Sequence, residues 1–385
     1  MSKKRTNKGL LVLAALAALL LALGLAACGG GDDTSASGGS TEAESTEAET
    51  GGEEGGGEEP VSIAMEEILT GVAFGQEIKQ GIEAYAAEDP NASVEVQGPP
   101  STEPEVAQKQ ATDMLAKNPD AFGFAPFPPE LWTRTAQNIW DQVGPNVLTF
   151  NERPTSEVDT VSTSPVQTFV GTADTSEARE ILEKTIELAE LPESFTGEVI
   201  LGQCVAQEAG VLAQRTDGFE EALAKLLPNA KVDKFTSEVE PQANTKAWTT
   251  KLAAQPNAEL AIGTCDQDGT SLYKVKKEKG YDLIVGAMEL PPETVAGLKD
   301  GSIIAAVGTN WWLQGYTATR MLAEAARGAE LPEGWVNTGY KFYTGDSIAE
   351  IEERSNEPEK FFAADVEELF GAGMPTAEPI EGAFE

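Results

Sequence analysis

Short apolar runs alternate with amphipathic segments along most of the chain, from residue 61 onward. A short apolar run bounded by turn residues is typical of a buried strand, and apolar positions three or four residues apart are typical of a helix. The first half of this pattern predicts strands at 61–65, 92–96, 120–125, 146–150 and 169–172 and helices at 74–88, 104–117 and 129–142.

The same alternation begins again near residue 198. It predicts strands at 198–203, 231–235, 259–264, 282–286 and 303–307 and helices at 209–227, 242–254, 270–279, 291–300 and 313–327. Strands that alternate with helices form parallel sheets covered on both faces. We therefore expect an α/β fold with two doubly wound, parallel-sheet lobes. The remaining segment predicts a strand at 340–343 and acidic helical stretches at 347–354 and 365–370.

The N-terminus has the layout of a secretory signal over residues 1–27. Four basic residues lie within the first eight positions, and an uncharged apolar run follows at 10–25. Small residues then lead into Cys28, and Leu25-Ala26-Ala27-Cys28 resembles a bacterial lipobox. An uncleaved transmembrane anchor is the alternative, because the run is nearly long enough to span a bilayer. Both interpretations place the rest of the chain outside the cytoplasmic membrane.

Residues 28–60 are almost entirely Gly, Ser, Thr and Glu, with ten acidic residues and no basic one. Such a segment cannot bury enough apolar surface to fold, so we expect an acidic, disordered tether. The formal charge of the whole chain is −37, and the part beyond the tether, with 23 basic and 54 acidic residues, keeps a charge near −31. A surface this acidic repels nucleic acid and anionic lipid headgroups, so neither is an expected partner.

The chain contains no histidine. This excludes Ser-His-Asp and Cys-His nucleophilic sites and histidine metal sites. No Gly-x-Gly-x-x-Gly follows a predicted strand, and no phosphate-binding Gly-x-x-x-x-Gly-Lys-Ser/Thr occurs. We therefore expect a binding protein without cofactor or metal rather than an enzyme.

Polar and aromatic residues follow the predicted strands directly. Ligands bind beyond the carboxyl ends of parallel strands, so these positions form the expected binding site. Aromatic rings can stack on the apolar face of a sugar, and planar polar groups can bind its hydroxyls. The candidate ligand-binding residues are Phe74, Phe127, Asn151, Arg215, Asp266, Glu289, Asn310, Trp311 and Trp312.

Several of these residues also have a purely structural interpretation. Arg215 could form a surface ion pair, and Asn151 could belong to a turn. Asp266 could cap the helix predicted at 270–279, although Asp268 fits that role better. Trp132 is a weaker candidate for the site.

Two acidic residues, Glu66 and Glu67, follow the first predicted strand. We expect both to be solvated, although one of them could bind a hydroxyl or a cationic group.

Two cysteines remain if Cys28 is lipidated, an even number in an oxidising compartment. Cys204 and Cys265 end the first and third predicted strands of the second lobe. These strands are neighbours in a flavodoxin-like strand order, about 4.8 Å apart, so a disulfide at the floor of a cleft is feasible. Two buried thiols are the alternative.

A series of short motifs follows one order along residues 61–328. They are Phe74 to Gly81, Asn118-Pro119-Asp120-Ala121, Asn146 to Asn151, Arg215-Thr216-Asp217-Gly218-Phe219, Cys265 to Asp268, Gly301 to Ala306 and Gln314-Gly315. In order and spacing they resemble the ribose-type (type I) periplasmic sugar-binding proteins, the substrate-binding components of ABC importers.

This resemblance implies a lipid-anchored monomer that delivers a sugar-like solute to an ABC permease, with Cys28 acylated and Arg215 contacting the sugar. The implied lobes are 61–172 plus 311–331 and 173–310 plus 332–385, the second including the acidic tail. The implied hinge consists of three strands, near 172–174, 308–310 and 332–337.

Three departures from the ribose-type pattern, at Asn151-Glu152, Gly286 to Glu289 and Thr309-Asn310, indicate a ligand other than ribose. Two other functions stay open. The same fold could serve a sensory receptor that signals to a membrane partner, or an exported glycosidase could use carboxylates facing each other across the cleft.

Overall fold

The computed structural model describes residues 59–155, 164–206 and 210–385. The signal segment 1–27, Cys28 and most of the tether lie outside the described residues. Residues 56–385 form one compact unit. In the part of the chain that the structure describes, no helix has the length and apolar character needed to cross a membrane.

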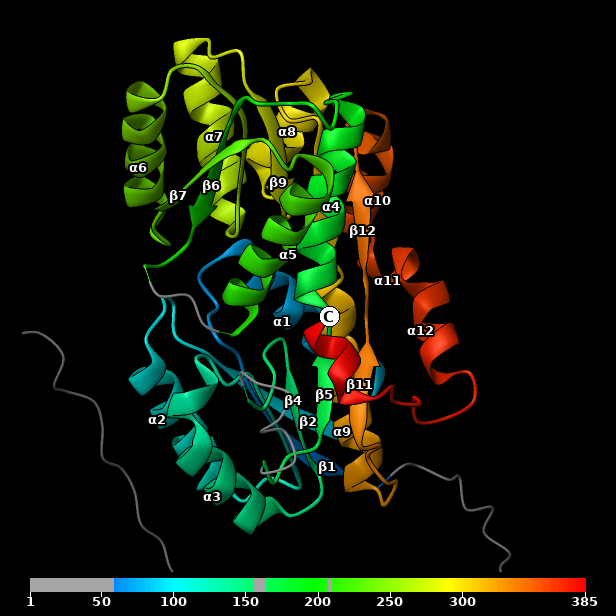
Figure 1. The fold of residues 1–385 in the computed structure, drawn as a ribbon. Helices are drawn as coiled ribbons and strands as arrows, with labels where there is room; N and C mark the ends of the chain where they lie inside the picture. The colour runs from blue at the N-terminus through cyan, green and yellow to red at the C-terminus, as the bar shows by residue number, and fades with distance from the viewer. Residues whose placement is uncertain (1–58, 156–163, 207–209) are drawn as a thin grey trace, which may run out of the picture. The chain divides into compact units, whose positions relative to one another are not determined.

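The first lobe is built on a six-stranded sheet (Figure 1). Its strands, in spatial order, are β11 (Gly334–Asn337), β5 (Thr168–Gly171), β4 (Val147–Phe150), β3 (Ala121–Phe124), β1 (Val61–Glu66) and β2 (Ala92–Gln97), and all neighbours are parallel. Side chains alternate between the two faces of a strand. In β1, Ile63 and Met65 pack toward α1 (Ala73–Glu88) and α9 (Trp311–Ala326). Ala64 packs on the opposite side, toward α2 (Pro104–Leu115) and α3 (Thr133–Val143).

Helices α1 and α9 approach each other closely because glycine lies at their contact. A Cβ atom on Gly81 would lie 1.9 Å from the carbonyl oxygen of Trp312, and one on Gly315 would lie 2.1 Å from that of Ile78. Only glycine fits at such a backbone approach. The two helices therefore pack as one layer, which fixes Trp311 and Phe74 at adjacent helix starts.

The second lobe repeats this architecture around another six-stranded sheet. Its strands, in spatial order, are β12 (Tyr340–Tyr343), β10 (Ala305–Thr309), β9 (Ile284–Met288), β8 (Ala258–Gly263), β6 (Glu198–Gln203) and β7 (Lys231–Thr236). Strand β12 pairs antiparallel with β10, and the other pairs are parallel.

Helices cover both faces of the second sheet. Helices α4 (Asp174–Leu188) and α5 (Gly210–Leu226) share one apolar core with it. The opposite core is formed with α6 (Pro241–Ala254), α7 (Asp266–Lys279) and α8 (Pro292–Asp300). The predicted fold class, two α/β lobes with sheets dominated by parallel pairs, is confirmed.

Three segments of chain connect the two sheets. The first leaves β5 at 172–173 and the second joins β10 to α9 at Asn310, both within the predicted hinge positions. The third runs from β11 to β12 through Thr338 and Gly339, later than the predicted 332–337. Strand β11 belongs to the first sheet, where it pairs with β5, so the chain after residue 332 does not pass directly into the second lobe.

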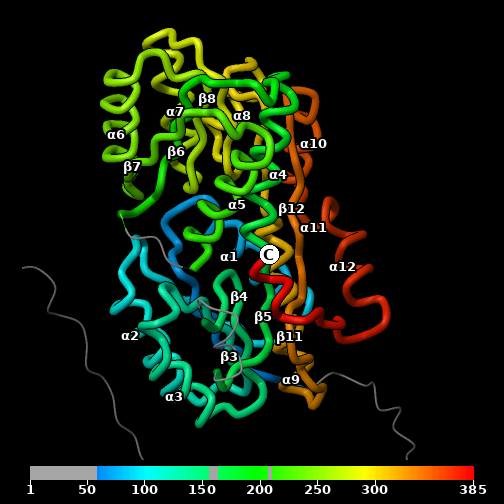
Figure 2. Tube along the Cα trace, in the orientation of Figure 1, coloured from blue at the N-terminus to red at the C-terminus, as the bar shows by residue number. Residues whose placement is uncertain are grey.

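The acidic tail also departs from its expected place in the second lobe. Helix α10 (Ile348–Asn356) follows β12 in that lobe. Phe362, which lies between α11 (Pro358–Phe361) and α12 (Ala363–Phe370), packs instead into the first-lobe core, as does Phe370 of α12. The C-terminal turn at 380–384 packs Ala383 against Trp335 and Phe169. The C-terminus accordingly lies beside β5 and α4 (Figures 1 and 2).

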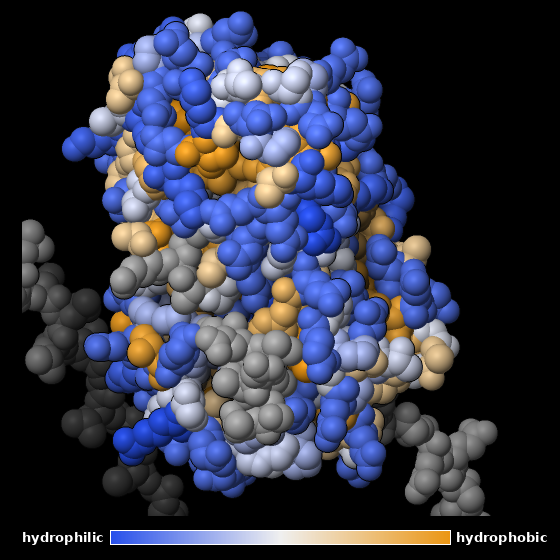
Figure 3. Space-filling model, viewed as in Figure 1, coloured by the Kyte–Doolittle hydropathy of each residue, from blue (hydrophilic) through white to orange (hydrophobic). Residues whose placement is uncertain are grey.

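Most elements begin and end within two residues of their predicted bounds. Two differences affect the site. Helix α4 was not predicted, and α7 begins at Asp266 instead of residue 270. The visible surface in Figure 3 is mostly hydrophilic, as the excess of acidic residues requires.

Candidate functional site

A cavity of about 120 Å³ lies between the two lobes, at the carboxyl ends of their strands. One water molecule needs only about 10–15 Å³ of such space, so the cavity has room for a small solute. The first lobe lines it with Ile68, Leu69, Val72, Phe74, Thr102, Phe127, Asn151 and Trp311. The second lobe lines it with Cys204, Val205, Val211, Leu212, Arg215, Val239, Thr264, Cys265, Asp266, Gln267 and Glu289.

Seven of the nine predicted ligand-binding residues therefore line one cavity. The other two lie elsewhere. Asn310 is part of a connection between the lobes, where its amide donates to Thr338 and accepts from Arg354. Trp312 is buried in the first-lobe core, where its ring stacks on those of Tyr316 and Phe362.

Three weaker candidates also lie away from the cavity. Trp132 is buried and stacks on Phe124. The expectation that Glu66 and Glu67 are solvated is wrong, because they are only 0% and 1% exposed. Burial raises the pKa of both carboxyl groups, that of Glu67 to about 8. The carboxylate oxygens of Glu67 have no hydrogen-bond partner, and the residue lies near Lys79 of α1.

The aromatic side of the cavity comes from two helix starts. The rings of Phe74 and Trp311 lie 5.3 Å apart between centroids, tilted by 42°. The Trp311 indole Nε1 donates to the Glu289 carboxylate at 2.7 Å, which fixes the orientation of the ring. A solute in the cavity would therefore meet an ordered aromatic surface.

Asn151 adopts a left-handed backbone conformation, with φ of 62°, directly after β4. Asparagine tolerates this conformation better than most residues. Its side chain lines the cavity, is 6% exposed, and leaves the amide oxygen Oδ1 without a partner. A buried acceptor without a donor is costly, so a ligand that donates a hydrogen bond would be favoured here.

Arg215 is buried within a network of carboxylates. Its guanidinium contacts Asp174 at 3.1 Å, Glu177 at 3.4 Å and Glu289 at 3.1 Å, and it also donates to the Thr264 carbonyl at 3.2 Å. Burial acts to lower the pKa of Arg215, but the three carboxylates outweigh it and raise that pKa. The alternative of a surface ion pair is wrong, because the ion pairs of Arg215 are buried. The residue also lines the cavity, where it was predicted to contact the ligand.

Glu289 accepts hydrogen bonds on both of its oxygens. Arg215 and the Thr309 hydroxyl donate to Oε1, at 3.1 and 3.0 Å. Trp311 donates to Oε2, and the Thr309 amide approaches the same oxygen at 3.4 Å. Glu289 thereby links the charged network of the second lobe to the aromatic wall of the first.

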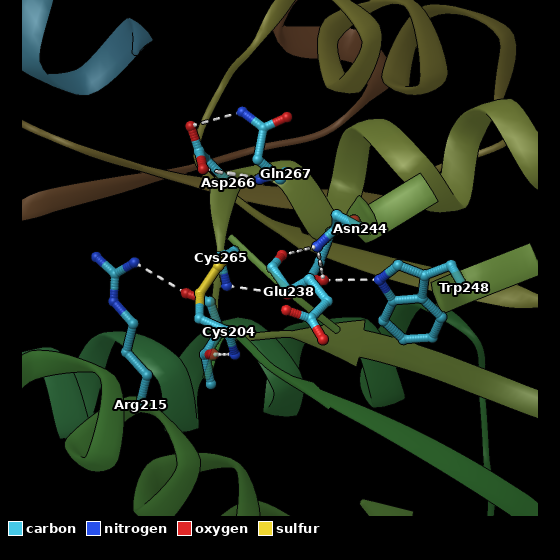
Figure 4. Close-up of a disulfide and its surroundings, with 10 residues drawn as sticks. Cys204, Arg215, Glu238, Asn244, Trp248, Cys265, Asp266 and Gln267 are labelled. Carbon is cyan, nitrogen blue, oxygen red and sulfur yellow. Dashed lines mark hydrogen bonds between the residues drawn. A yellow bond between two sulfur atoms is a disulfide. The ribbon is translucent and has the colours of Figure 1, made fainter. Parts of the chain in front are cut away.

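Asp266 and Asp268 lie two residues apart in the sequence and occupy different environments. Figure 4 shows Asp266 beside Gln267. Asp268 is buried and accepts from the Cys265 amide at 3.0 Å, from Asn244 at 2.9 Å and from the Trp248 indole at 2.6 Å. It supports the first turn of α7 from inside the helix, at its third position. It therefore acts within the helix rather than as the residue that precedes it.

Asp266 is the first residue of α7 and lines the cavity. One oxygen accepts from the Gln267 amide at 2.8 Å, and the other meets only the Gln267 side chain at 3.4 Å. Burial raises the pKa of Asp266 to about 6, and the charge of Glu289 adds to the shift. Among the described residues no cationic side chain forms an ion pair with Asp266, although the charge of Arg215 acts on it, and its carboxylate can accept a further donor.

Cys204 and Cys265 are joined in a disulfide, with their Cα atoms 5.6 Å apart (Figure 4). They follow β6 and β8, which pair in parallel, and both line the cavity. Among the described residues, only these two sulfurs and the Asp268 carboxylate form a cluster able to hold a metal. The disulfide occupies the sulfurs, and Asp268 already accepts three hydrogen bonds, so the cluster does not fit a metal ion.

The structure adds residues that the sequence interpretation missed. Asp174 and Glu177 lie in the first turn of the unpredicted α4. Glu152 extends from the first lobe to the second, where it accepts from the Val211 amide at 3.2 Å. Burial raises the pKa of Glu152 to about 7. This hydrogen bond joins the two lobes, as expected for a closed cleft.

Together, the fold and the cavity define a two-lobed binding protein of the type I periplasmic fold. The chain belongs to the family described as "periplasmic binding protein domain", which matches residues 69–330. This confirms the resemblance found in the motifs, and the family implies a location outside the cytoplasm. No curated protein sequence matches the chain.

Solved structures show the same fold. A solute-binding protein of an ABC transporter from Burkholderia graminis C4D1M, in complex with D-arabinose, is 21% identical. Its TM-score is 0.67, and the match covers 75% of this chain and 97% of that one. A glucose-galactose binding protein from Geobacillus stearothermophilus is 20% identical, with a TM-score of 0.65 and coverage of 75% and 98%.

A third structure, from Mycobacterium smegmatis in complex with β-D-fucofuranose, is 18% identical. Its TM-score is 0.68, with coverage of 79% of this chain and 97% of that one. At these identities, the three structures establish only the fold. The ligand of this chain has to be inferred from its own residues.

Proposed function

We propose that this protein is the solute-binding component of an ABC importer, which captures a small, polar, sugar-like solute between its lobes and delivers it to a membrane permease. The sugars in the similar structures support this class of ligand. The departures at Asn151 and Glu289 argue for a solute other than ribose. We further propose that the protein acts as a monomer and needs no cofactor.

The observation that carries the proposal is a cavity walled by both lobes. Phe74 and Trp311 contribute from the first lobe, and Asp266 and Arg215 contribute from the second. A solute that contacts both lobes binds the closed state better than the open one and shifts the population toward it. This closure provides the signal that a permease can recognise, and it needs no covalent step.

An exported glycosidase is less well supported. Such an enzyme needs two carboxylates that flank the scissile bond. Among the described residues that line the cavity, the carboxylates are Asp266 and Glu289, and both come from the second lobe. Glu289 is also engaged with Arg215 and Trp311. A sensory receptor with the same fold would have the same cleft, and only its membrane partner would distinguish it.

Tryptophan fluorescence tests the binding function, because Trp311 lines the cavity. The purified full-length protein is titrated with sugars, polyols and other small metabolites while its melting temperature is recorded. We expect a saturable fluorescence change and a higher melting temperature with one chemical class. Asn151→Ala should weaken this response, whereas Asn356→Ala, at an exposed position of α10, should preserve it. The absence of any response would contradict a solute-binding function.

We also propose that diacylglycerol on Cys28 anchors the protein to the outer face of the membrane. Cys28 lies outside the described residues, and the proposal rests on the lipobox-like Leu25-Ala26-Ala27-Cys28 and the tether after it. Mass spectrometry of the membrane fraction should find Cys28 as the lipid-bearing first residue. Cys28→Ala should abolish that species. Retention of residues 1–27 in the mature protein would instead favour the transmembrane anchor.

A further inference from the structure

The hydrogen-bonding groups of the cavity are unequally occupied. The guanidinium of Arg215 uses Nε, Nη1 and Nη2 on four protein acceptors, and both oxygens of Glu289 accept from the protein. Asn151 Oδ1 has no partner, and Asp266 Oδ2 has only a long contact with its neighbour Gln267. These two groups are acceptors, so the cavity favours a ligand that carries hydrogen-bond donors.

The charge around the cavity is also unequal. Asp174, Glu177 and Glu289 surround Arg215, and Asp174 also contacts Arg153 at 3.3 Å. Two further carboxyl groups join this cluster: Glu152, which lies 4.0 Å from Arg153, and Asp266, which interacts with Glu289.

The cluster therefore holds five carboxyl groups against two guanidinium groups, an excess of three acidic groups. Buried carboxylates without a cationic partner are costly, so they either take up protons or gain stability from a cation. Burial is the main cause of the raised pKa values of Asp266, Glu152 and Glu177, and the neighbouring carboxylates add to it.

The opposite wall of the cavity suits a cation as well. An ammonium group within about 6 Å of an aromatic face is attracted to it. Phe74 and Trp311 present such faces, and Trp311 is held by its bond to Glu289. A neutral sugar could use these rings, but it would leave the carboxylate of Asp266 without a counterion.

We propose that the solute is a small organic cation, a polar body that carries a protonated amino group bound by Asp266 and facing the aromatic wall. Asn151 Oδ1 would accept a further donor from the same solute. This inference rests on the proposed solute-binding function and narrows its chemistry, because a cationic sugar such as an amino sugar satisfies both.

Matched pairs of compounds test the inference in the full-length protein at pH 7. D-glucose is compared with D-glucosamine and D-galactose with D-galactosamine, and N-acetyl-D-glucosamine removes the charge while keeping the nitrogen. D-glucuronate supplies the opposite charge, and ethanolamine and putrescine supply ammonium groups without a sugar. Calorimetry gives each dissociation constant.

We expect at least one amine to bind about tenfold or more tightly than its neutral counterpart, and glucuronate to bind weakest. Asp266→Asn should remove most of this preference, because the amide keeps the shape of the carboxyl group and loses its charge. Asp282→Asn, an exposed change of equal charge in the same lobe, should keep the preference. Because the preference is first measured in the unaltered protein, the test does not depend on the folding of the variant.

The outcomes separate the two proposals. If neutral sugars bind as tightly as the corresponding amines, the proposal that the solute is a cation is overturned. The proposed capture of a solute then still stands. If ethanolamine or putrescine binds and no sugar in the set does, the proposal of a cationic solute is supported. The proposal that this solute is a sugar is then overturned. Tight binding of glucuronate, or binding of no compound in the set, would overturn the inference, and the second result would count against sugar capture too.

Discussion

The two lobes contribute different chemistry to the same cavity. The first lobe provides shape, through apolar and aromatic side chains such as Phe74 and Trp311. The second lobe provides charge, through Asp266, Glu289 and Arg215. Within the part of the chain that the structure describes, the charged residues that line the cavity all come from the second lobe.

This division matters when the cleft opens. Arg215 and its partners Asp174, Glu177 and Glu289 all belong to the second lobe, so opening would not separate them. The charged half of the site is therefore preorganised before the solute arrives, which reduces the cost of binding. Closure then adds the aromatic wall and excludes water.

Removal of the central cation should produce the largest effect. Arg215→Ala would leave three buried carboxylates without their shared partner, and loss of one member of a buried pair costs about 3–5 kcal/mol. Arg179→Ala removes a more exposed ion pair with Glu221 on the same lobe and should cost less than about 1 kcal/mol. Urea unfolding measures both. Equal losses for the two variants would show that the network does not stabilise the second lobe.

The disulfide should give the next largest effect. Cys204 and Cys265 enclose a loop with a sequence separation of 61. Removal of a disulfide typically costs about 2–4 kcal/mol, mainly because the unfolded chain gains freedom. The double variant Cys204→Ala, Cys265→Ala should lower stability by that amount in urea unfolding. Reduction of the unaltered protein should reproduce the loss, and an unchanged midpoint after reduction would contradict a bonded pair.

Acidification from pH 8 to pH 5 should raise the melting temperature by a few degrees. Burial raises the folded-state pKa of Glu67 to about 8, of Glu152 to about 7 and of Asp266 to about 6, all above their unfolded values near 4. Such groups favour folding when protonated, and this contribution is lost as the pH rises through the folded pKa. Asp300, whose pKa the Ser302 hydrogen bonds lower to about 2, stays ionised throughout.

Calorimetric melts at several pH values check this direction, and Glu67→Gln should flatten the dependence. A melting temperature that rises from pH 5 to pH 8 would contradict this account. It would mean that the folded protein stabilises the ionised form of these carboxyl groups more than their contacts indicate.

The aromatic wall should give the smallest effect, and one confined to binding. Phe74→Ala removes an aromatic face of the cavity and should weaken solute binding about tenfold, or about 1.4 kcal/mol. Phe342→Ala, which removes a ring that packs on Tyr340 in the second lobe, should leave the affinity within about twofold. Calorimetric titration compares the two. An unchanged affinity in the first variant would mean that the solute does not reach this wall.

The sequence was sufficient for the strands and for most of the cavity. Apolar periodicity marks the sheets, and ligand-binding residues follow strand ends, which is why Asn151, Asp266 and Glu289 were found. Helix α4 was missed although Ala178, Ile181 and others repeat at helical spacing. The helix lies in the connection between the two predicted series, from 173 to 197, where no element was assigned although strands were expected on both sides.

Other features depended on packing between distant segments. Glu66 and Glu67 read as solvated because acidic residues rarely lie buried, and only their packing in the first lobe encloses them. The role of Arg215 was also hidden, because its partners come from α4 and from the residue after β9. The third connection was placed too early because β11 and β12 lie only two residues apart.

A crystal structure of the full-length protein with its tightest-binding solute would test the central claim most directly. We expect the solute in the cavity between the lobes, in contact with Trp311 of the first and Asp266 of the second. A solute bound to one lobe alone, or outside this cavity, would contradict capture by closure of the cleft.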